Sequence, residues 1–157
     1  EAARFLDTNP AFWGKVININ YVGPLNMCHI IGSAMVERGS GRVINISSDA
    51  GRVGSSGEAV YAGCKGALIA FGKTLARELA RRGVTVNTIC PGPTDTPLLR
   101  GVDPTGKLQD ALKKAIPMRR LGEPEDFPGM VAFFASEEAN YITGQVISIS
   151  GGLTMHG

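Results

Sequence analysis

A tyrosine and a lysine four residues apart carry the most specific chemical signal in this sequence. They are Tyr61 and Lys65 of the segment YAGCK. Residues at this spacing on a helix share one face, with Cβ atoms about 5–6 Å apart. A phenol ionises at about pH 10, but a neighbouring ammonium stabilises the phenolate and lowers its pKa. Proton exchange between Tyr61 and a substrate oxygen then becomes feasible, and Ser48 could hydrogen-bond the same oxygen.

Each candidate also has an ordinary interpretation. A Tyr–Lys pair at this spacing often occurs by chance, and a serine at a strand end commonly caps a turn. Asn20, in the segment NINYVG, suits a surface or capping amide. His29 fits a packed or surface histidine, and Cys64 and Cys90 fit small core residues. The candidates therefore gain weight only together, on elements that bring them close to one another.

Three short β-branched runs predict the strands of one parallel sheet. They alternate with helical segments, and strands separated by helices pair in parallel through right-handed crossovers. Apolar strands such as VINI and VISI fit a sheet covered on both faces, so an α/β layered fold is expected. The expected strands are 42–48, 84–90 and 144–150, and the expected helices are 10–37, 58–82, 107–116 and about 124–136.

Local signals mark where these elements begin and end. Asn9 followed by Pro10 is a helix start, Gly23-Pro24 suggests a break in that first helix, and Gly83 is a helix terminator. Residues 49–57 are expected to form a glycine-rich loop. Residues 91–106 are too rich in Pro and Gly for regular structure and are long enough for a lid. Because ligands bind at the carboxyl ends of parallel strands, the site should lie beside these two loops.

Composition limits the class of protein. The chain has 157 residues, which suits a single domain over 1–157, and a formal net charge of +2. No basic block supports a nucleic-acid or membrane-surface partner, and the longest apolar run, near Met130–Ala135, cannot span a bilayer. Cys28, Cys64 and Cys90 form no CxxC pair, which argues against a disulfide scaffold and a structural zinc site. No metal site is expected, and a reducing, cytoplasmic setting is expected.

The order of these motifs resembles the short-chain dehydrogenase/reductase family over essentially the whole chain. The YxxxK motif of the family is matched by Tyr61 and Lys65, and its serine, thirteen residues before the tyrosine, by Ser48. Asn20 matches its helix asparagine, and Pro91-Gly92 matches its PG motif. Residues 121–152 follow the family pattern, except that Ser150 precedes the final Gly-Gly and that Phe127-Pro128 stands early in the last helix, where Pro128 fits only the first turn.

The resemblance implies a fold and a reaction. The fold is a Rossmann-like, doubly wound parallel sheet in three α/β/α layers, and the reaction interconverts a secondary alcohol and a ketone with NAD or NADP. Tyr61 would exchange the proton, Lys65 would lower the pKa of Tyr61 and bind the nicotinamide ribose, and Ser48 would orient the carbonyl. Asn20 would hold a water that relays protons through Lys65.

The resemblance also implies two sets of binding residues. Backbone at Thr94 would meet the carboxamide of the cofactor, and Thr96 the nearby phosphate or ribose. The expected cofactor-binding residues are Asn20, Tyr61, Lys65, Pro91, Gly92, Thr94 and Thr96. The expected substrate contacts are Ser48, Asp49, Arg52 and Tyr61.

The glycine-rich phosphate turn that this fold needs at its first strand does not appear in the sequence. GRVGSSG, at 51–57, follows the substrate serine and is read as a substrate-side loop rather than a pyrophosphate cradle. We therefore expect the chain to be the catalytic, C-terminal part of the domain, with an N-terminal half of roughly 80–100 residues missing before Glu1. Alone it is expected to bind the cofactor weakly or not at all and to turn over nothing.

Substrate and assembly stay open at this stage. The segment 47–66 resembles 3-oxoacyl-thioester reductases and hydroxyacyl-CoA dehydrogenases, including those acting on alicyclic acyl-CoA compounds. A CoA or carrier-protein thioester is therefore the expected substrate, and sugar- or steroid-type alcohols are the alternatives. A non-catalytic scaffold or inactive fragment of the same fold is the second hypothesis, and a serine hydrolase fails for want of a GxSxG elbow. Helix 58–82 is apolar on more than one side, which favours a homo-oligomer, a dimer or tetramer.

Overall fold

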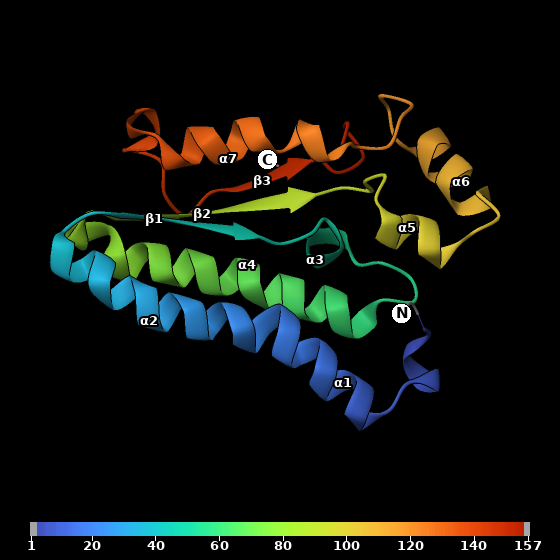
Figure 1. Cartoon of the computed structure of the whole chain (residues 1–157), viewed down its shortest axis with the longest axis horizontal. Coiled ribbons are helices and arrows are strands. Elements are labelled where there is room, and N and C mark those ends of the chain that lie inside the picture. The colour runs from blue at the N-terminus through green and yellow to red at the C-terminus, as the bar shows by residue number, and fades with distance from the viewer. Residues whose placement is uncertain (1–2, 156–157) are drawn as a thin grey trace.

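Three parallel strands form one sheet in the computed structural model, which describes residues 3–155. The strands are β1 (Gly41–Ile46), β2 (Val84–Pro91) and β3 (Val146–Ile149), in the spatial order β1-β2-β3 (Figure 1). Gly41 of β1 pairs with Val84, and Thr88 of β2 pairs with Val146. Each expected strand is present: β1 begins one residue earlier and ends two residues earlier than expected, β2 extends one residue further, and β3 is shorter at both ends.

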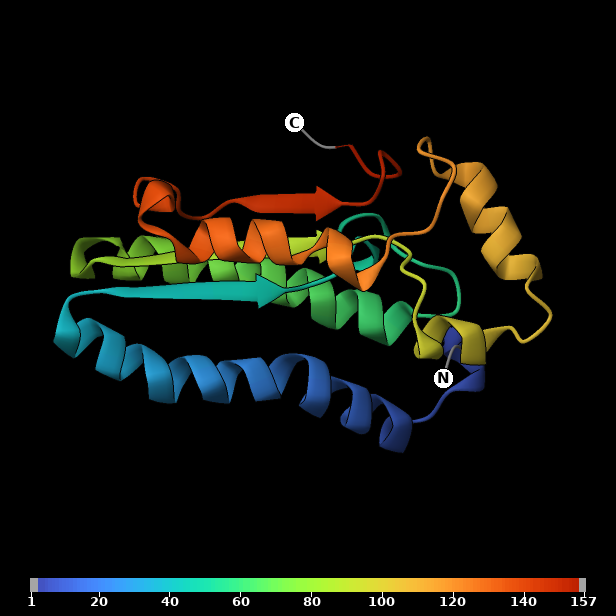
Figure 2. The same ribbon diagram turned by 45° about the horizontal axis from the view of Figure 1, so that its top comes forward.

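Helices cover both faces of this sheet. Figure 1 shows α2 (Gly23–Arg38) and α4 (Ala59–Leu79) on one side and α7 (Pro128–Ala135) on the other. The short helices α3 (Ala50–Val53), α5 (Pro97–Val102) and α6 (Lys107–Ala115) stand at the carboxyl ends of the strands, with α6 furthest out (Figure 2). The α/β layered architecture expected from the sequence is confirmed.

Strand β2 is the centre of the core because it has a strand on each side and helices on both faces. Every residue from Val84 to Cys90 is buried. On one face Ile89 packs with Phe134 of α7 and Ala139. The chain also contains four single turns of 3-10 helix, at Phe5–Asp7, Ala80–Arg82, Pro124–Asp126 and Glu137–Ala139.

The first long helix is irregular at a different place from the one expected. It begins as predicted, in α1 (Pro10–Ile17), where the Asn9 side chain accepts a hydrogen bond from the Phe12 N–H at 3.0 Å. The chain then makes a wide π-type turn at Asn18–Val22 before α2. Pro24 lies in the first turn of α2 and has no N–H to donate to the Asn20 carbonyl four residues back. The widening therefore falls in the turn before the proline and includes Asn20.

Two loops contain helices that the sequence did not predict. The expected lid, 91–106, holds α5, because Pro97 stands at its first position and the Thr96 hydroxyl caps it by accepting from the Leu99 N–H at 3.3 Å. A proline at this position starts a helix instead of breaking one. The loop 49–57 likewise contains α3. Pro128 takes the first position of α7, as expected.

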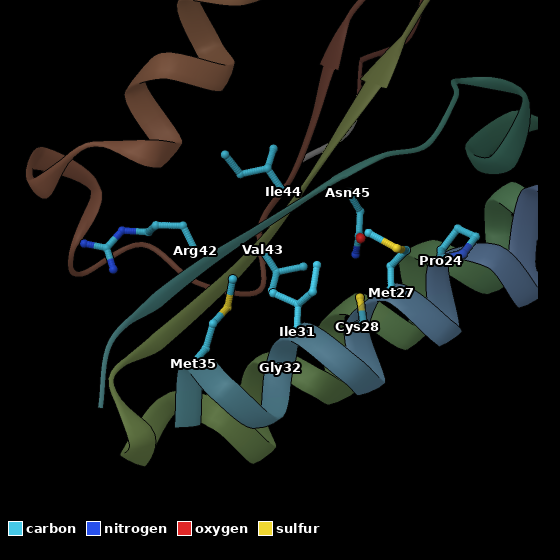
Figure 3. A pocket seen from close by; sticks show the side chains of 10 residues that line it. All are labelled: Pro24, Met27, Cys28, Ile31, Gly32, Met35, Arg42, Val43, Ile44 and Asn45. Carbon is cyan, nitrogen blue, oxygen red and sulfur yellow. The ribbon is translucent and has the colours of Figure 1, made fainter. Parts of the chain in front are cut away.

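The outer edge of β1 has no partner strand within residues 3–155. Beside this edge lies a pocket between α2 and β1, whose lining includes Pro24, Met27, Cys28, Ile31, Val43 and Asn45 (Figure 3). Met27 and Ile46, both apolar, keep about half of their surface exposed (58% and 47%). Parallel sheets are normally covered on both faces, and the unpaired N–H and C=O groups of an edge strand can pair with a further strand, so this side of the sheet is open to further pairing. Across the described residues, no helix is both long and apolar enough to cross a lipid bilayer.

Gly83 provides a test of the turn that leads into β2. It terminates the preceding turn with a φ of 70°, and a Cβ there would stand 2.1 Å from the Gly39 carbonyl oxygen. We expect Gly83→Ala to lower the free energy of unfolding by about 1–3 kcal/mol. The control is Gly63→Ala, on an exposed position of α4 where a Cβ meets nothing within 4 Å. This control should stabilise the chain by about 1 kcal/mol. Urea unfolding of both variants makes the measurement, and equal effects would contradict this account.

Candidate active site

The candidate catalytic residues meet where β1 ends against the start of α4. Ser48 lies two residues beyond β1, and Tyr61 and Lys65 occupy the first two turns of α4. The Lys65 ammonium lies over the Tyr61 ring, with Nζ 5.6 Å from the ring centroid. The shared helix face expected from the four-residue spacing is confirmed.

Lys65 is held at the sheet by its own side chain and by its backbone. Its ammonium donates to the Ile46 carbonyl at 3.1 Å, and its carbonyl accepts from the Ser47 hydroxyl at 2.8 Å. Burial lowers the pKa of Lys65, because a partly buried ammonium loses hydration. The two bonds join the last residue of β1 and the residue after it to the second turn of α4.

The pKa of Tyr61 moves in the direction opposite to the one expected from the sequence. Burial of the phenol raises its pKa, the hydrogen bond with the Ser48 side chain lowers it, and the charge of Glu58 raises it. Burial outweighs the hydrogen bond because a phenolate loses more hydration than a neutral phenol. The charge of Lys65 is not among the causes of the shift, so the lowering expected from Lys65 is not found. Tyr61 is thus held in its protonated form at neutral pH.

Ser48 is set against the helix by a close backbone approach. Its Oγ accepts from the Ala50 N–H at 3.1 Å, at the start of α3. One residue on, a Cβ at Gly51 would stand 2.6 Å from the Lys65 carbonyl carbon and 2.7 Å from the Gly66 nitrogen. Only glycine lets α3 lie this close to α4, which explains how a serine thirteen residues from the tyrosine comes to contact it.

Asn20 lies in the π-type turn that packs against α4, the helix carrying Tyr61 and Lys65. Its side-chain amide donates to the Val16 carbonyl at 3.0 Å, which leaves the amide oxygen for another donor. π-type turns occur often at functional sites. Asn20 therefore belongs to the same region of the fold, as expected.

The expected cofactor residues beyond β2 make hydrogen bonds to β3 and within their own loop. The Gly92 N–H donates to the Ile149 carbonyl at 2.9 Å, and a Cβ on Gly92 would stand 2.7 Å from that of Ser150. The Thr94 hydroxyl donates to the Gly92 carbonyl at 2.9 Å, and the Thr96 hydroxyl caps α5. This loop follows Pro91 at the carboxyl edge, beside the end of β1. The two hydroxyls shape the loop.

Two expected substrate contacts, Asp49 and Arg52, point into the protein instead. Asp49 is only 5% exposed and accepts a short hydrogen bond from the Ser148 hydroxyl of β3. Arg52 donates from one nitrogen, Nη1, to Ser148 Oγ at 3.0 Å and to the Val146 carbonyl at 3.3 Å. Ser148 was not predicted from the sequence, although a serine within the apolar run VISI was a signal. Arg52 can reach Ser148 because α3 carries it back over the sheet.

The chain is similar to known proteins over nearly its whole length. A sequence model for the family described as "Enoyl-(Acyl carrier protein) reductase" matches residues 1–154. The acetoacetyl-CoA reductase of Shinella zoogloeoides is 43% identical over 150 residues, covering 96% of this chain and 62% of that protein. The chain belongs to the short-chain dehydrogenase/reductase family and spans about three fifths of the length of the curated relatives it matches.

Solved structures give the same result for the fold. A gluconate 5-dehydrogenase from Burkholderia cenocepacia, in complex with NADP and tartrate, superposes with a TM-score of 0.94 at 29% identity, covering 98% of this chain and 60% of that one. A 3-oxoacyl-[acyl-carrier protein] reductase from Brucella melitensis gives 0.92 at 34% identity, with 99% and 58% covered. The expected family and Rossmann-like fold are confirmed.

Gly51 offers a test of the contact between α3 and α4. We expect Gly51→Ala to reduce the free energy of unfolding by about 1–3 kcal/mol, since the new methyl group meets backbone atoms that cannot move aside. Gly14→Ala, in α1, is the matched control because a Cβ there meets nothing within 4 Å. Thermal unfolding of both variants makes the comparison. A Gly51→Ala chain as stable as the control would show that α3 does not pack against α4 in this way.

Proposed function

We propose that the protein containing this chain is an NAD(P)-dependent oxidoreductase that interconverts a secondary alcohol and a ketone. The observation that carries the proposal is the junction of β1 and α4. There the Ser48 hydroxyl lies near the half-buried Tyr61 phenol and lowers its pKa, and the Lys65 ammonium lies over the ring of that phenol. A scaffold without turnover has no physical need to bury a phenol and an ammonium side by side.

Tyr61 and Ser48 would act on the substrate oxygen. Because burial raises its pKa, Tyr61 keeps its proton at neutral pH and can donate it to the oxygen of a ketone as that oxygen gains negative charge. Ser48 would hydrogen-bond the same oxygen and hold the carbonyl in place. In the reverse direction the Tyr61 phenolate accepts the proton of the alcohol.

The residues beside Tyr61 fit a nicotinamide cofactor. An ammonium has three N–H donors, and the described residues supply one acceptor to Lys65, the Ile46 carbonyl, so donors remain for ribose hydroxyls. Asn20 keeps its amide oxygen for a water that leads protons toward Lys65, and Thr94 offers backbone from the adjoining loop. When bound, NAD or NADP supplies or accepts the hydride, and the protein supplies position and the proton.

A 3-oxoacyl or 3-hydroxyacyl thioester is the substrate class that we favour, including 2-hydroxycycloalkane acyl thioesters. The support is that the Shinella relative, at 43% identity, is named an acetoacetyl-CoA reductase, and the Brucella neighbour a 3-oxoacyl-[acyl-carrier protein] reductase. A sugar-type alcohol is the second candidate, because the Burkholderia neighbour is a gluconate 5-dehydrogenase. We further propose a homo-oligomer, and a cytoplasmic location in keeping with three free cysteines.

We also propose that residues 1–157 are the C-terminal, catalytic part of an NAD(P)-binding Rossmann domain. The open outer edge of β1 and the apolar pocket beside it support this, because such an edge suits another parallel strand. The chain matches only 62% of its Shinella relative. The remaining part of the domain would cover this edge and contribute most of the cofactor site.

A chimera tests the domain proposal. The part of the Shinella reductase that precedes the matched stretch is joined to this chain. We expect the chimera to oxidise NADH or NADPH when acetoacetyl-CoA is added, and the 157-residue chain alone to show no turnover. Absorbance of the reduced cofactor follows the reaction. Turnover by the chain alone would contradict the domain proposal, and a folded chimera that binds cofactor yet reduces no ketone would contradict the oxidoreductase.

Tyr61→Phe tests the proton donor in the same chimera. Removing the phenolic hydroxyl should lower kcat by at least about a hundredfold while cofactor binding, followed by fluorescence titration, changes little. Tyr141→Phe is the control. Tyr141 is fully exposed in the loop before β3, so this variant should keep full activity. Activity that survives in Tyr61→Phe would show that another group donates the proton.

A further inference from the structure

Asp49 is a buried acidic residue to which the proposed chemistry gives no role. Its Oδ1 accepts from the Ser148 hydroxyl, and its Oδ2 has no hydrogen-bond partner among residues 3–155. The Ser148 hydroxyl in turn accepts from the Arg52 guanidinium at 3.0 Å. A hydroxyl can donate to a carboxylate and accept from a guanidinium at once, so the three side chains form one connected network. We call it the Asp49 network.

The backbone around Ser48 is anchored on both sides. The Ser47 N–H donates to the Ile89 carbonyl at 2.8 Å, and the Asp49 N–H donates to the Pro91 carbonyl at 3.0 Å. Ser47 and Asp49 thus continue the pairing with β2 beyond the end of β1. Through its side chain Asp49 also reaches past β2 to Ser148 of β3, which is paired with Cys90. The residue next to Ser48 is therefore tied to two neighbouring strands.

Arg52 ties the following helix to the same strand. Its guanidinium donates to the Val146 carbonyl at 3.3 Å as well as to Ser148, which holds α3 over the sheet. The first residue of α3, Ala50, donates its N–H to Ser48 Oγ at 3.1 Å. A shift of α3 would therefore move the group that orients the Ser48 hydroxyl.

Stability alone does not account for this arrangement. Replacing a buried set of charged and polar groups by apolar residues of similar volume is often neutral or stabilising. A hydroxyl that must meet a phenol at one position, by contrast, needs neighbours with directional bonds. We propose that Asp49, Ser148 and Arg52 are positioning residues that hold the Ser48 hydroxyl where it can hydrogen-bond the Tyr61 phenol.

The importance of this contact for catalysis rests on the proposed function, but the contact can be tested in the 157-residue chain without any turnover. The chain has three tyrosines, so a Tyr21→Phe/Tyr141→Phe background leaves Tyr61 as the only reporter. A fluorinated tyrosine at position 61 ionises at lower pH, which keeps the titration in a range where the chain stays folded. Fluorine NMR then follows its ionisation. Glu58 and Lys65, the charged groups beside Tyr61, stay unchanged in every variant.

The central variant is Ser148→Ala, which changes no charge. Ser48→Ala removes the hydrogen bond that lowers the pKa of Tyr61, so it should raise that pKa by about half a unit to one unit. If the Asp49 network positions Ser48, Ser148→Ala raises the pKa of Tyr61 by a similar amount. The Ser48→Ala/Ser148→Ala double variant then has the same Tyr61 pKa as Ser48→Ala alone. Asp49→Asn retains an oxygen that accepts from the Ser148 hydroxyl, so it should keep most of the wild-type contact between Ser48 and Tyr61. Ser56→Ala, an exposed serine beyond α3, is the matched control and should change nothing.

Asp49→Ala separates position from charge. Removing a negative charge near a phenol would by itself lower the pKa of Tyr61, so a rise in this variant shows a lost hydrogen bond. Circular dichroism establishes that each chain is folded. A Ser148→Ala chain with a lower melting temperature but an unchanged Tyr61 titration would overturn the proposal and reduce the network to a structural role. A double variant in which the two increases in the Tyr61 pKa simply add would also overturn the proposal. A chimera in which Tyr61 titrates as in the wild-type chain but which shows no turnover would count against the proposed function alone.

Discussion

The end of β1 is held against the second turn of α4, and the rest of the site depends on this contact. The Ser47 hydroxyl donates to the Lys65 carbonyl, the Lys65 ammonium donates to the Ile46 carbonyl, and Gly51 lets α3 approach the same turn of backbone. These contacts place Ser48 beside Tyr61, although the two belong to different elements. Local structure alone does not bring these two side chains together, because a strand end and a helix face meet only when the helix packs on the sheet.

Burial at this contact also decides the electrostatics. The pKa of Tyr61 is raised and that of Lys65 is lowered, each because the charged form loses hydration. The phenol therefore keeps its proton at neutral pH, as the proposed reduction of a ketone requires. The hydrogen bond from Ser48 works against burial, so its geometry sets how strong an acid Tyr61 can be. A network that holds Ser48 in place would then act on proton transfer without touching the substrate.

Local rules predicted much of this molecule. The Asn9–Pro10 helix start, the Gly83 terminator and the shared face of Tyr61 and Lys65 all follow from short-range sterics and hydrogen bonding, and all are confirmed. The family pattern supplied Ser48. What could not be predicted depends on tertiary packing: the burial that reverses the direction of the Tyr61 pKa shift, and the path by which Arg52 reaches β3. Residues 91–106 were expected to lack regular structure because they are rich in proline. That prediction was wrong at α5, because composition alone does not show that Pro97 stands at the first position of a helix.

The pKa of Tyr61, measured in the folded chain by carbon NMR of labelled tyrosine, tests the central claim most directly. The account requires a phenol that is half-buried, hydrogen-bonded to Ser48 and beside an ammonium already engaged by the Ile46 carbonyl. It predicts ionisation above the ordinary tyrosine value of about 10. Ionisation at or below that value would show that the ammonium rather than burial governs the phenol, and the site described here would be wrong in its most important interaction.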